Sequence, residues 1–154
     1  MASQFEVFNK LTSALNALGI KYTVIAPGAI LGGTFLLSNN LGTTGFSLML
    51  SNGFVTNRTY MTSTMIQYTW PLLDFVNRAN QLMTFGNFEF KLLQAAQLNF
   101  RYSVPWSVIM FGSLDEVSMF VKTPSAMFTR FLPGMYEVMR TGNVGHAIEM
   151  CIQG

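Results

Sequence analysis

The sequence predicts an α+β fold, in which an antiparallel β-sheet or sandwich is flanked by helices. Three observations lead to this prediction. Apolar residues recur at helical spacing over 4–18 and 71–85, they alternate with polar residues within 20–70 and 87–111, and the C-terminal third reads as helical. No linker, repeat or low-complexity tract divides the chain, so we expect one domain spanning residues 1–154.

The N-terminal helix is predicted by its cap and its apolar stripe. Ser3 precedes Glu6 by three residues, which is the spacing of a capping box. Apolar side chains then follow at intervals of three or four: Phe5, Phe8, Leu11, Leu15 and Leu18. Gly19 suits the left-handed conformation that commonly ends a helix, so we expect the helix to cover about 4–18.

Two alternating segments predict strands joined by a tight turn. Phe46, Leu48 and Leu50 alternate with Ser47, Met49 and Ser51. Ser-Asn-Gly at 51–53 then supplies residues that favour a tight turn. A second period-two series is rich in β-branched and aromatic residues: Tyr60, Thr62, Thr64, Ile66, Tyr68 and Trp70. The face between these positions carries no charge, so both faces of the strands can be covered.

The second half of the chain predicts further helices around two more strands. Pro71, which is tolerated in a first helical turn, opens the helix over 71–85. Alternation over 87–104 predicts strands on both sides of Leu-Gln-Ala-Ala-Gln at 93–97, where a helix is also possible.

Prolines are expected to divide the C-terminal third. Ser113 and Glu116 repeat the capping-box spacing and open a helix that should reach about Val121, because Thr123-Pro124 should break it. A short helix over 125–132 should then end at Pro133-Gly134, with short helical pieces after it.

The scarcity of charge is the main functional signal. Charged residues make up 10% of the chain, against roughly 25% in ordinary soluble domains, and none lies between Lys21 and Arg58. The chain also has 14 Phe and 11 Met, and the cores of protein interfaces are depleted in charge and enriched in such residues. We therefore expect a structural subunit, not an enzyme, that assembles with copies of itself and with other structural subunits.

The predicted assembly is a viral or phage particle component, such as a shell, tail or tube protein, located in the virion or in a cytoplasmic assembly. Uncharged edge strands should be protected by pairing with neighbouring subunits. The residues that we expect at this subunit interface are Met61, Met65, Gln67, Trp70, Phe46, Leu48 and Trp106.

Two other classes of function remain open. One is a small membrane-embedded or secretion-channel component, with 22–37 and 104–121 entering the bilayer, because the mean hydropathy of +0.35 is high. The glycines, proline and short length of the first segment disfavour a simple span. The other is a ligand-binding protein or enzyme with an aromatic pocket. The net charge of +2 is small and scattered, which gives no indication of specific nucleic-acid binding.

No catalytic, cofactor or metal site is predicted. His146 and Glu149 share a helical face, but two ligands do not make a metal site, and Cys151 lies in an apolar context that favours an inert thiol. The glycines over 28–33 lack the lysine and hydroxyl of a phosphate loop and indicate close backbone approach instead. Arg101 lies among aromatic residues, which could form a base-stacking platform for single-stranded nucleic acid. We favour the alternative that Arg101 is an outward-facing cation on a core strand.

Overall fold

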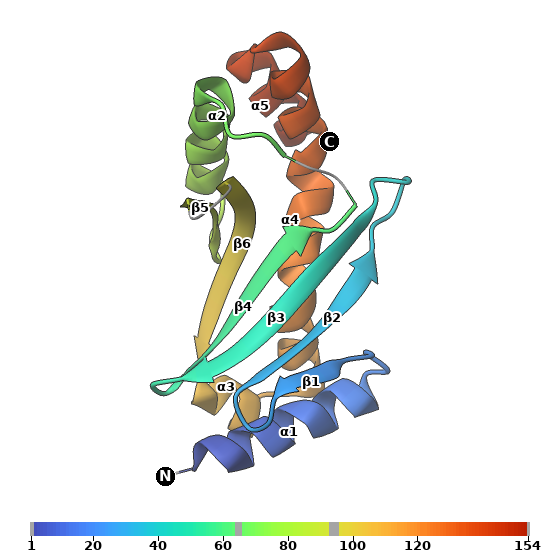
Figure 1. Cartoon of the computed structure of the whole chain (residues 1–154), viewed down its shortest axis with the longest axis vertical. Helices are drawn as coiled ribbons and strands as arrows, with labels where there is room; N and C mark the ends of the chain where they lie inside the picture. The colour runs from blue at the N-terminus through green and yellow to red at the C-terminus, as the bar shows by residue number, and fades with distance from the viewer. Residues whose placement is uncertain (1, 64–65, 93–95, 154) are drawn as a thin grey trace.

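The computed structural model describes residues 2–63, 66–92 and 96–153, and its architecture is α+β as predicted (Figure 1). The helices are α1 (Gln4–Ala17), α2 (Trp70–Gln81), α3 (Trp106–Phe111), α4 (Leu114–Thr141) and α5 (Val144–Gln153). The strands are β1 (Thr23–Ala26), β2 (Ile30–Leu36), β3 (Thr43–Ser51), β4 (Phe54–Met61), β5 (Asn87–Leu92) and β6 (Ala96–Pro105).

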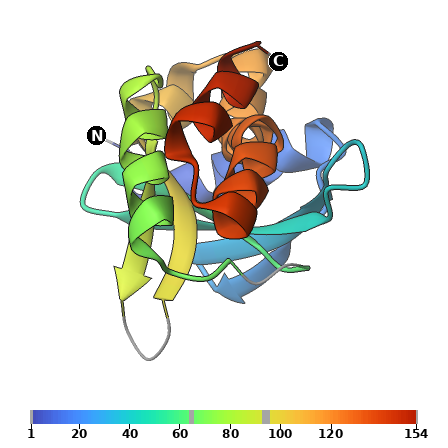
Figure 2. The ribbon, with the colours of Figure 1, turned by 90° about the horizontal axis from the view of Figure 1, so that it is seen from above.

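The strands form a single antiparallel sheet and not a sandwich. Their order is β1-β2-β3-β4-β6-β5, so β1 and β5 are the two edge strands. The Ser-Asn-Gly turn joins β3 to β4 as predicted, with Asn52 and Gly53 both at positive φ. Seen along the long axis, α2, α4 and α5 all lie on one side of the sheet (Figure 2).

Two apolar clusters fill the space between the sheet and the helices. One joins α1, α3 and the first turns of α4 to β2, β3 and β4. The other joins α2, α5 and the later turns of α4 to β5 and β6, and it contains the T-shaped ring pairs of Phe88 with Phe100 and Phe128. Because α4 contributes to both clusters, this 28-residue helix connects the two halves of the core.

The prediction that Pro124 and Pro133 end helices was wrong, since both lie inside α4. A proline has no N–H, so Pro124 leaves the carbonyl of Phe120 without its usual donor. Asn57 on β4 supplies the replacement: its buried side-chain amide donates to the carbonyls of Phe120 and Val121, at 3.2 and 3.1 Å. The sheet therefore satisfies the helix at the point where its own ladder is interrupted.

A second buried polar contact reinforces this junction. The hydroxyls of Thr44 on β3 and Ser125 on α4 lie 2.7 Å apart, and Thr59 donates to the side-chain oxygen of Asn57 at 2.9 Å. Neither partner in these pairs is exposed to solvent. Buried hydroxyls and amides are retained at low cost only when they are paired, as these are.

Gly134, which was expected to end a helix, instead allows other helices to approach α4. A Cβ at this position would lie 2.6 Å from the Cys151 sulfur on α5 and 2.7 Å from the Phe75 ring on α2. Glycine lowers the helix propensity at this position, but its lack of a side chain allows α2 and α5 to pack closely against α4.

Three other boundaries differ from the predictions. The alternation from Tyr60 to Trp70 continues as a strand only to Met61, and residues 66–69 form an irregular connection to α2. Residues 106–111 form the short helix α3 instead of a strand, and α2 ends at Gln81, four residues early. The segment 93–97 has strand on either side, while 93–95 lie outside the described residues.

Removing the Asn57 amide should lower the free energy of unfolding, because Pro124 cannot supply the missing hydrogen-bond donor. We expect Asn57→Ala to destabilise the fold by about 1–3 kcal/mol, because the Phe120 carbonyl is left buried without a donor. In a Pro124→Ala background the new N–H can donate to that carbonyl, so Asn57→Ala should cost at least about 1 kcal/mol less. Urea unfolding of the four proteins measures this coupling, and additive effects would contradict the proposed exchange of donors.

Gly134→Ala should destabilise the protein by about 1–3 kcal/mol despite the better helix propensity of alanine, because the added methyl has no room. Gly145→Ala on α5 is the matched control. The nearest atom to its Cβ would be an Asn143 oxygen 3.8 Å away, so that change should be neutral or stabilising. Thermal unfolding compares the two, and equal effects would contradict the close packing at Gly134.

Candidate interaction surfaces

The predicted interface residues do not form one surface. Phe46 and Leu48 were wrongly placed at a subunit contact: both are buried in the chain's own core, under α1 and α4. The alternation identified the strand correctly, but the apolar face of a strand next to helices is covered from within the same chain.

The other predicted positions are scattered. Met61 is half-buried against the second core cluster, and Met65 lies outside the described residues. Trp106 is half-buried at the start of α3 and its indole N–H donates to the Phe54 carbonyl at 3.0 Å. Gln67 and Trp70 are exposed, and Trp70 has 77% of its surface accessible at the first position of α2.

The sheet face opposite the helices carries the molecule's largest ion cluster among the described residues. Arg58 on β4 is directly opposite Arg101 on β6, a like-charge pair that is unfavourable by itself. Glu89 on β5 lies between them, with its carboxylate oxygens 3.6 Å from Arg58 Nε and 4.0 Å from Arg101 Nη1. Phe100 and Tyr102 point to the helix side of β6, away from Arg101, so these two rings do not form a platform with it.

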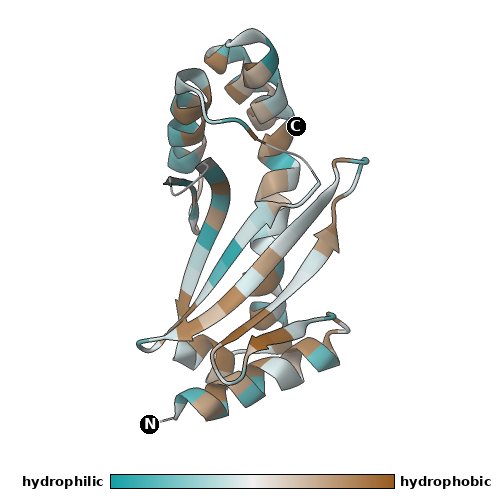
Figure 3. Ribbon diagram, in the orientation of Figure 1, coloured by the Kyte–Doolittle hydropathy of each residue, from teal (hydrophilic) through white to brown (hydrophobic). Residues whose placement is uncertain are grey.

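Exposed apolar side chains occur at both ends of the molecule, and one set lies at the end that carries the uncharged strand β1. We call this set, Phe5, Val24, Ile25, Phe111 and Leu114, the basal patch. It lies on α1, on β1 and at the corner between α3 and α4, which come together at the lower end in Figure 1. Ile25 and Phe5 are each 62% exposed and Phe111 is 85% exposed. Colouring by hydropathy shows β1 strongly apolar, whereas β4 and β6 carry hydrophilic positions (Figure 3).

The two sheet edges differ in their protection. β5 bears Glu89 and Lys91, charges of the kind that prevent edge-to-edge pairing. β1 bears no charge, although a register shift between Val24 and Ala26 puts a bulge at Ile25, which partly disrupts the edge. The uncharged edge therefore belongs to the same end of the molecule as the basal patch.

β1 also covers only part of β2, and leaves an open stretch of strand. Its pairing with β2 extends no further than Thr23 opposite Gly32. Beyond this, the Leu37 N–H donates to the Gly42 carbonyl at 2.8 Å, so by alternation Thr34 and Leu36 turn their own N–H and C=O groups away from β3. Among the residues that the structure describes, no strand pairs with that outward edge.

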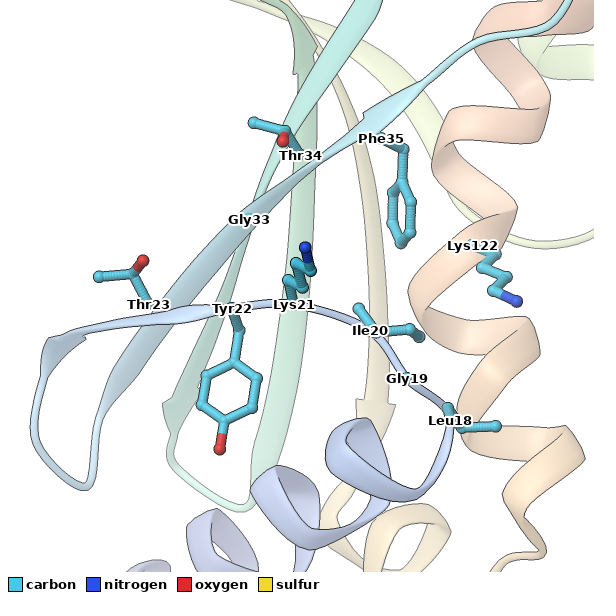
Figure 4. A pocket seen from close by; sticks show the side chains of 10 residues that line it. All are labelled: Leu18, Gly19, Ile20, Lys21, Tyr22, Thr23, Gly33, Thr34, Phe35 and Lys122. Atoms are coloured by element: carbon cyan, nitrogen blue, oxygen red, sulfur yellow. The ribbon is translucent and has the colours of Figure 1, made fainter.

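A hollow of about 630 Å³ lies where β1 separates from β2 (Figure 4). It is lined by Leu18, Gly19, Ile20, Lys21, Tyr22, Thr23, Gly33, Thr34, Phe35 and Lys122. Gly33 keeps this separation narrow, since a Cβ there would lie 2.7 Å from the Lys21 carbonyl and from the Phe46 ring. Gly33, and Gly32 with a Cβ that would lie 2.9 Å from the Phe46 carbonyl, confirm close backbone approach, whereas Gly28 lies at positive φ in the turn before β2.

Two cations and no carboxylate line the hollow. In Figure 4 the Lys21 ammonium points toward Thr34, whereas the ammonium of Lys122 on α4 is directed away from Lys21 and Phe35. Within 2–63, 66–92 and 96–153, no carboxylate lies within 4.0 Å of either lysine. The carbonyls of Ala14, Leu15 and Asn16 at the end of α1 already accept from backbone N–H groups, so they do not neutralise these charges.

The residues considered for chemistry are separate from one another. Cys151 is buried, and its burial raises the pKa of the thiol, which keeps it protonated and unreactive at neutral pH. His146 is exposed near the start of α5. No group of three or more potential metal ligands occurs within the described part of the chain.

The comparisons with known proteins identified no relative. No family model, no curated protein and no solved structure matches the chain. The segments considered for membrane insertion, 22–37 and 104–121, contain the β1–β2 hairpin and the end of β6 with α3. Over the described residues, no helix combines the length and the hydropathy required to cross a bilayer.

The burial of Cys151 predicts slow thiol labelling. We expect a disulfide reagent at pH 8 to modify the native protein at least about tenfold more slowly than the urea-unfolded chain, because local opening must precede reaction. Labelling followed by absorbance measures both rates. Equal rates would show that the thiol is accessible in the folded protein.

Proposed function

We propose that the chain is a structural subunit that assembles with copies of itself through the basal patch. The observation that carries the proposal is that Phe5, Val24, Ile25, Phe111 and Leu114 are exposed at the end of the molecule that has an uncharged sheet edge. Single exposed apolar residues are normal on monomers, but groups of them commonly mark contact surfaces.

The sparse charge of the whole surface supports the same proposal. The accessible area is 8429 Å² and carries 16 charged side chains, or about one per 530 Å². Area scaling gives about 7,800 Å² for a compact monomer of this mass. The chain therefore exposes slightly more surface than expected while having few ionised groups, so burying part of it requires little desolvation of charge.

The setting that we propose is a particle component, such as the shell, tail or tube of a virus or phage, or a comparable cytoplasmic assembly. Its support is compositional: many Phe and Met residues and few charges. A subunit of this kind functions by burying apolar area, at about 25 cal/mol per Å², and not by chemistry.

Charges introduced into the basal patch should weaken association. We expect Ile25→Lys and Phe111→Lys each to raise the dissociation constant at least about a hundredfold, because a desolvated, unpaired ammonium would enter the contact. Both side chains are exposed in the single chain, so folding should be preserved. Sedimentation velocity over a range of concentrations measures the change, and circular dichroism verifies the fold.

Ile152→Lys is the matched control. Ile152 is 56% exposed, similar to Ile25, but it lies on α5 at the opposite end of the molecule. It should leave the sedimentation distribution unchanged. A larger effect from Ile152→Lys than from the two basal substitutions would argue against the basal patch as the contact.

A further inference from the structure

We propose that the open edge of β2 is a binding site for the C-terminal segment of a partner protein. The segment would add as a strand beside Thr34–Leu36 and place its free carboxylate in the hollow next to Lys21. This site is separate from the basal patch, and the proposal does not depend on self-assembly.

Unpaired backbone groups provide the main attraction. Thr34 and Leu36 each direct an N–H and a C=O outward, and both residues are exposed. An extended peptide can pair with such an edge through main-chain hydrogen bonds, as in other cases of strand addition. In contrast to β1, this part of the edge has neither a bulge nor a proline to prevent pairing.

The geometry favours the end of a chain over an internal segment. A strand added beside Thr34 continues directly toward β1, which occupies the same edge from Thr23 onward. Lys21 and Tyr22 lie between the two positions, so an added strand must stop or turn in the hollow. A chain terminus satisfies this limit without a turn.

The positive charge of the hollow favours the C-terminus of a partner chain over its N-terminus. The hollow contains Lys21 and Lys122 and no acidic residue, so an α-carboxylate is attracted and an α-ammonium is repelled. With its carboxylate beside Thr34, the added segment runs antiparallel to β2, in the same direction as β1. Apolar side chains of the segment can contact Ile20 and Phe35, which also line the hollow.

Another copy of the chain is a poorer occupant of this edge where it would pair through β5. Its exposed edge strand β5 lies in a region that carries Arg58, Arg101 and Lys91 against one acid, Glu89. That surface would bring a net positive charge to the two lysines of the hollow. The observations therefore favour a partner chain that ends in a carboxylate without accompanying cations.

A matched pair of peptides tests the proposal. The probe is a hexapeptide of alternating threonine and valine that ends in valine, labelled at its N-terminus and titrated by fluorescence anisotropy. We expect the free acid to bind at least about tenfold more tightly than the C-terminal amide, because only the acid accepts charge-assisted bonds from lysine. A third peptide, amidated and with glutamate as its last residue, carries a side-chain carboxylate in place of the terminal one. It should also bind more weakly than the free acid.

Variants of the protein separate charge from backbone pairing. Lys21→Ala should weaken binding of the free acid about tenfold, whereas Lys91→Ala on the opposite edge should have no effect. Thr34→Pro removes an outward N–H without touching the ladder to β3 and should abolish binding, while Thr34→Val should retain it. If Thr34→Pro does not fold, the probe peptide can be N-methylated at alternate backbone nitrogens instead. This removes N–H groups that the peptide would donate to the β2 edge.

Several results would overturn the proposal. They are equal affinities for the acid and the amide, binding that survives N-methylation, and no binding of the free acid at about 1 mM peptide. An equal loss of affinity in Lys21→Ala and Lys91→Ala would also overturn it, because it would indicate nonspecific attraction to positive charge.

Discussion

The structure depends on α4 remaining helical through Pro124. This helix contributes to both apolar clusters, so a break near residue 121 would separate the turns that pack with α1 and α3 from the turns that pack with α2 and α5. Its continuity requires a donor for the Phe120 carbonyl, and Asn57 provides that donor from the middle of β4. One buried amide thus links the interior of the sheet to the interior of the longest helix.

Much of the fold could be predicted from local patterns. The capping box at Ser3 predicts α1, and in the structure the Ser3 hydroxyl accepts from the Glu6 N–H at 3.2 Å. The Thr69 side chain caps α2 in the same way, just before Pro71. The β3–β4 hairpin follows from its turn residues. These features depend on neighbours within a few positions, which a sequence displays directly.

The features that could not be predicted depend on distant residues. Whether a proline ends a helix is decided by a donor such as Asn57, 67 positions earlier in the chain than Pro124. Whether Phe46 and Leu48 face a neighbour or their own core depends on which helices cover the sheet. The basal patch combines α1, β1 and the α3–α4 corner, and the hollow combines β1, β2 and α4. No spacing in the sequence indicates these combinations, although the uncharged stretch from Lys21 to Arg58 contains β1 and β2.

The low charge of the chain has different consequences at different places on its surface. The sheet face opposite the helices retains its few charges as a bridged cluster, whereas the basal end has apolar side chains and an edge without charge. We interpret the basal end as a surface covered by another copy. Negative-stain electron microscopy of the purified wild-type protein tests this interpretation most directly. The account predicts regular rings, tubes or shells, and a field containing only single 17.2 kDa copies at high protein concentration would contradict it.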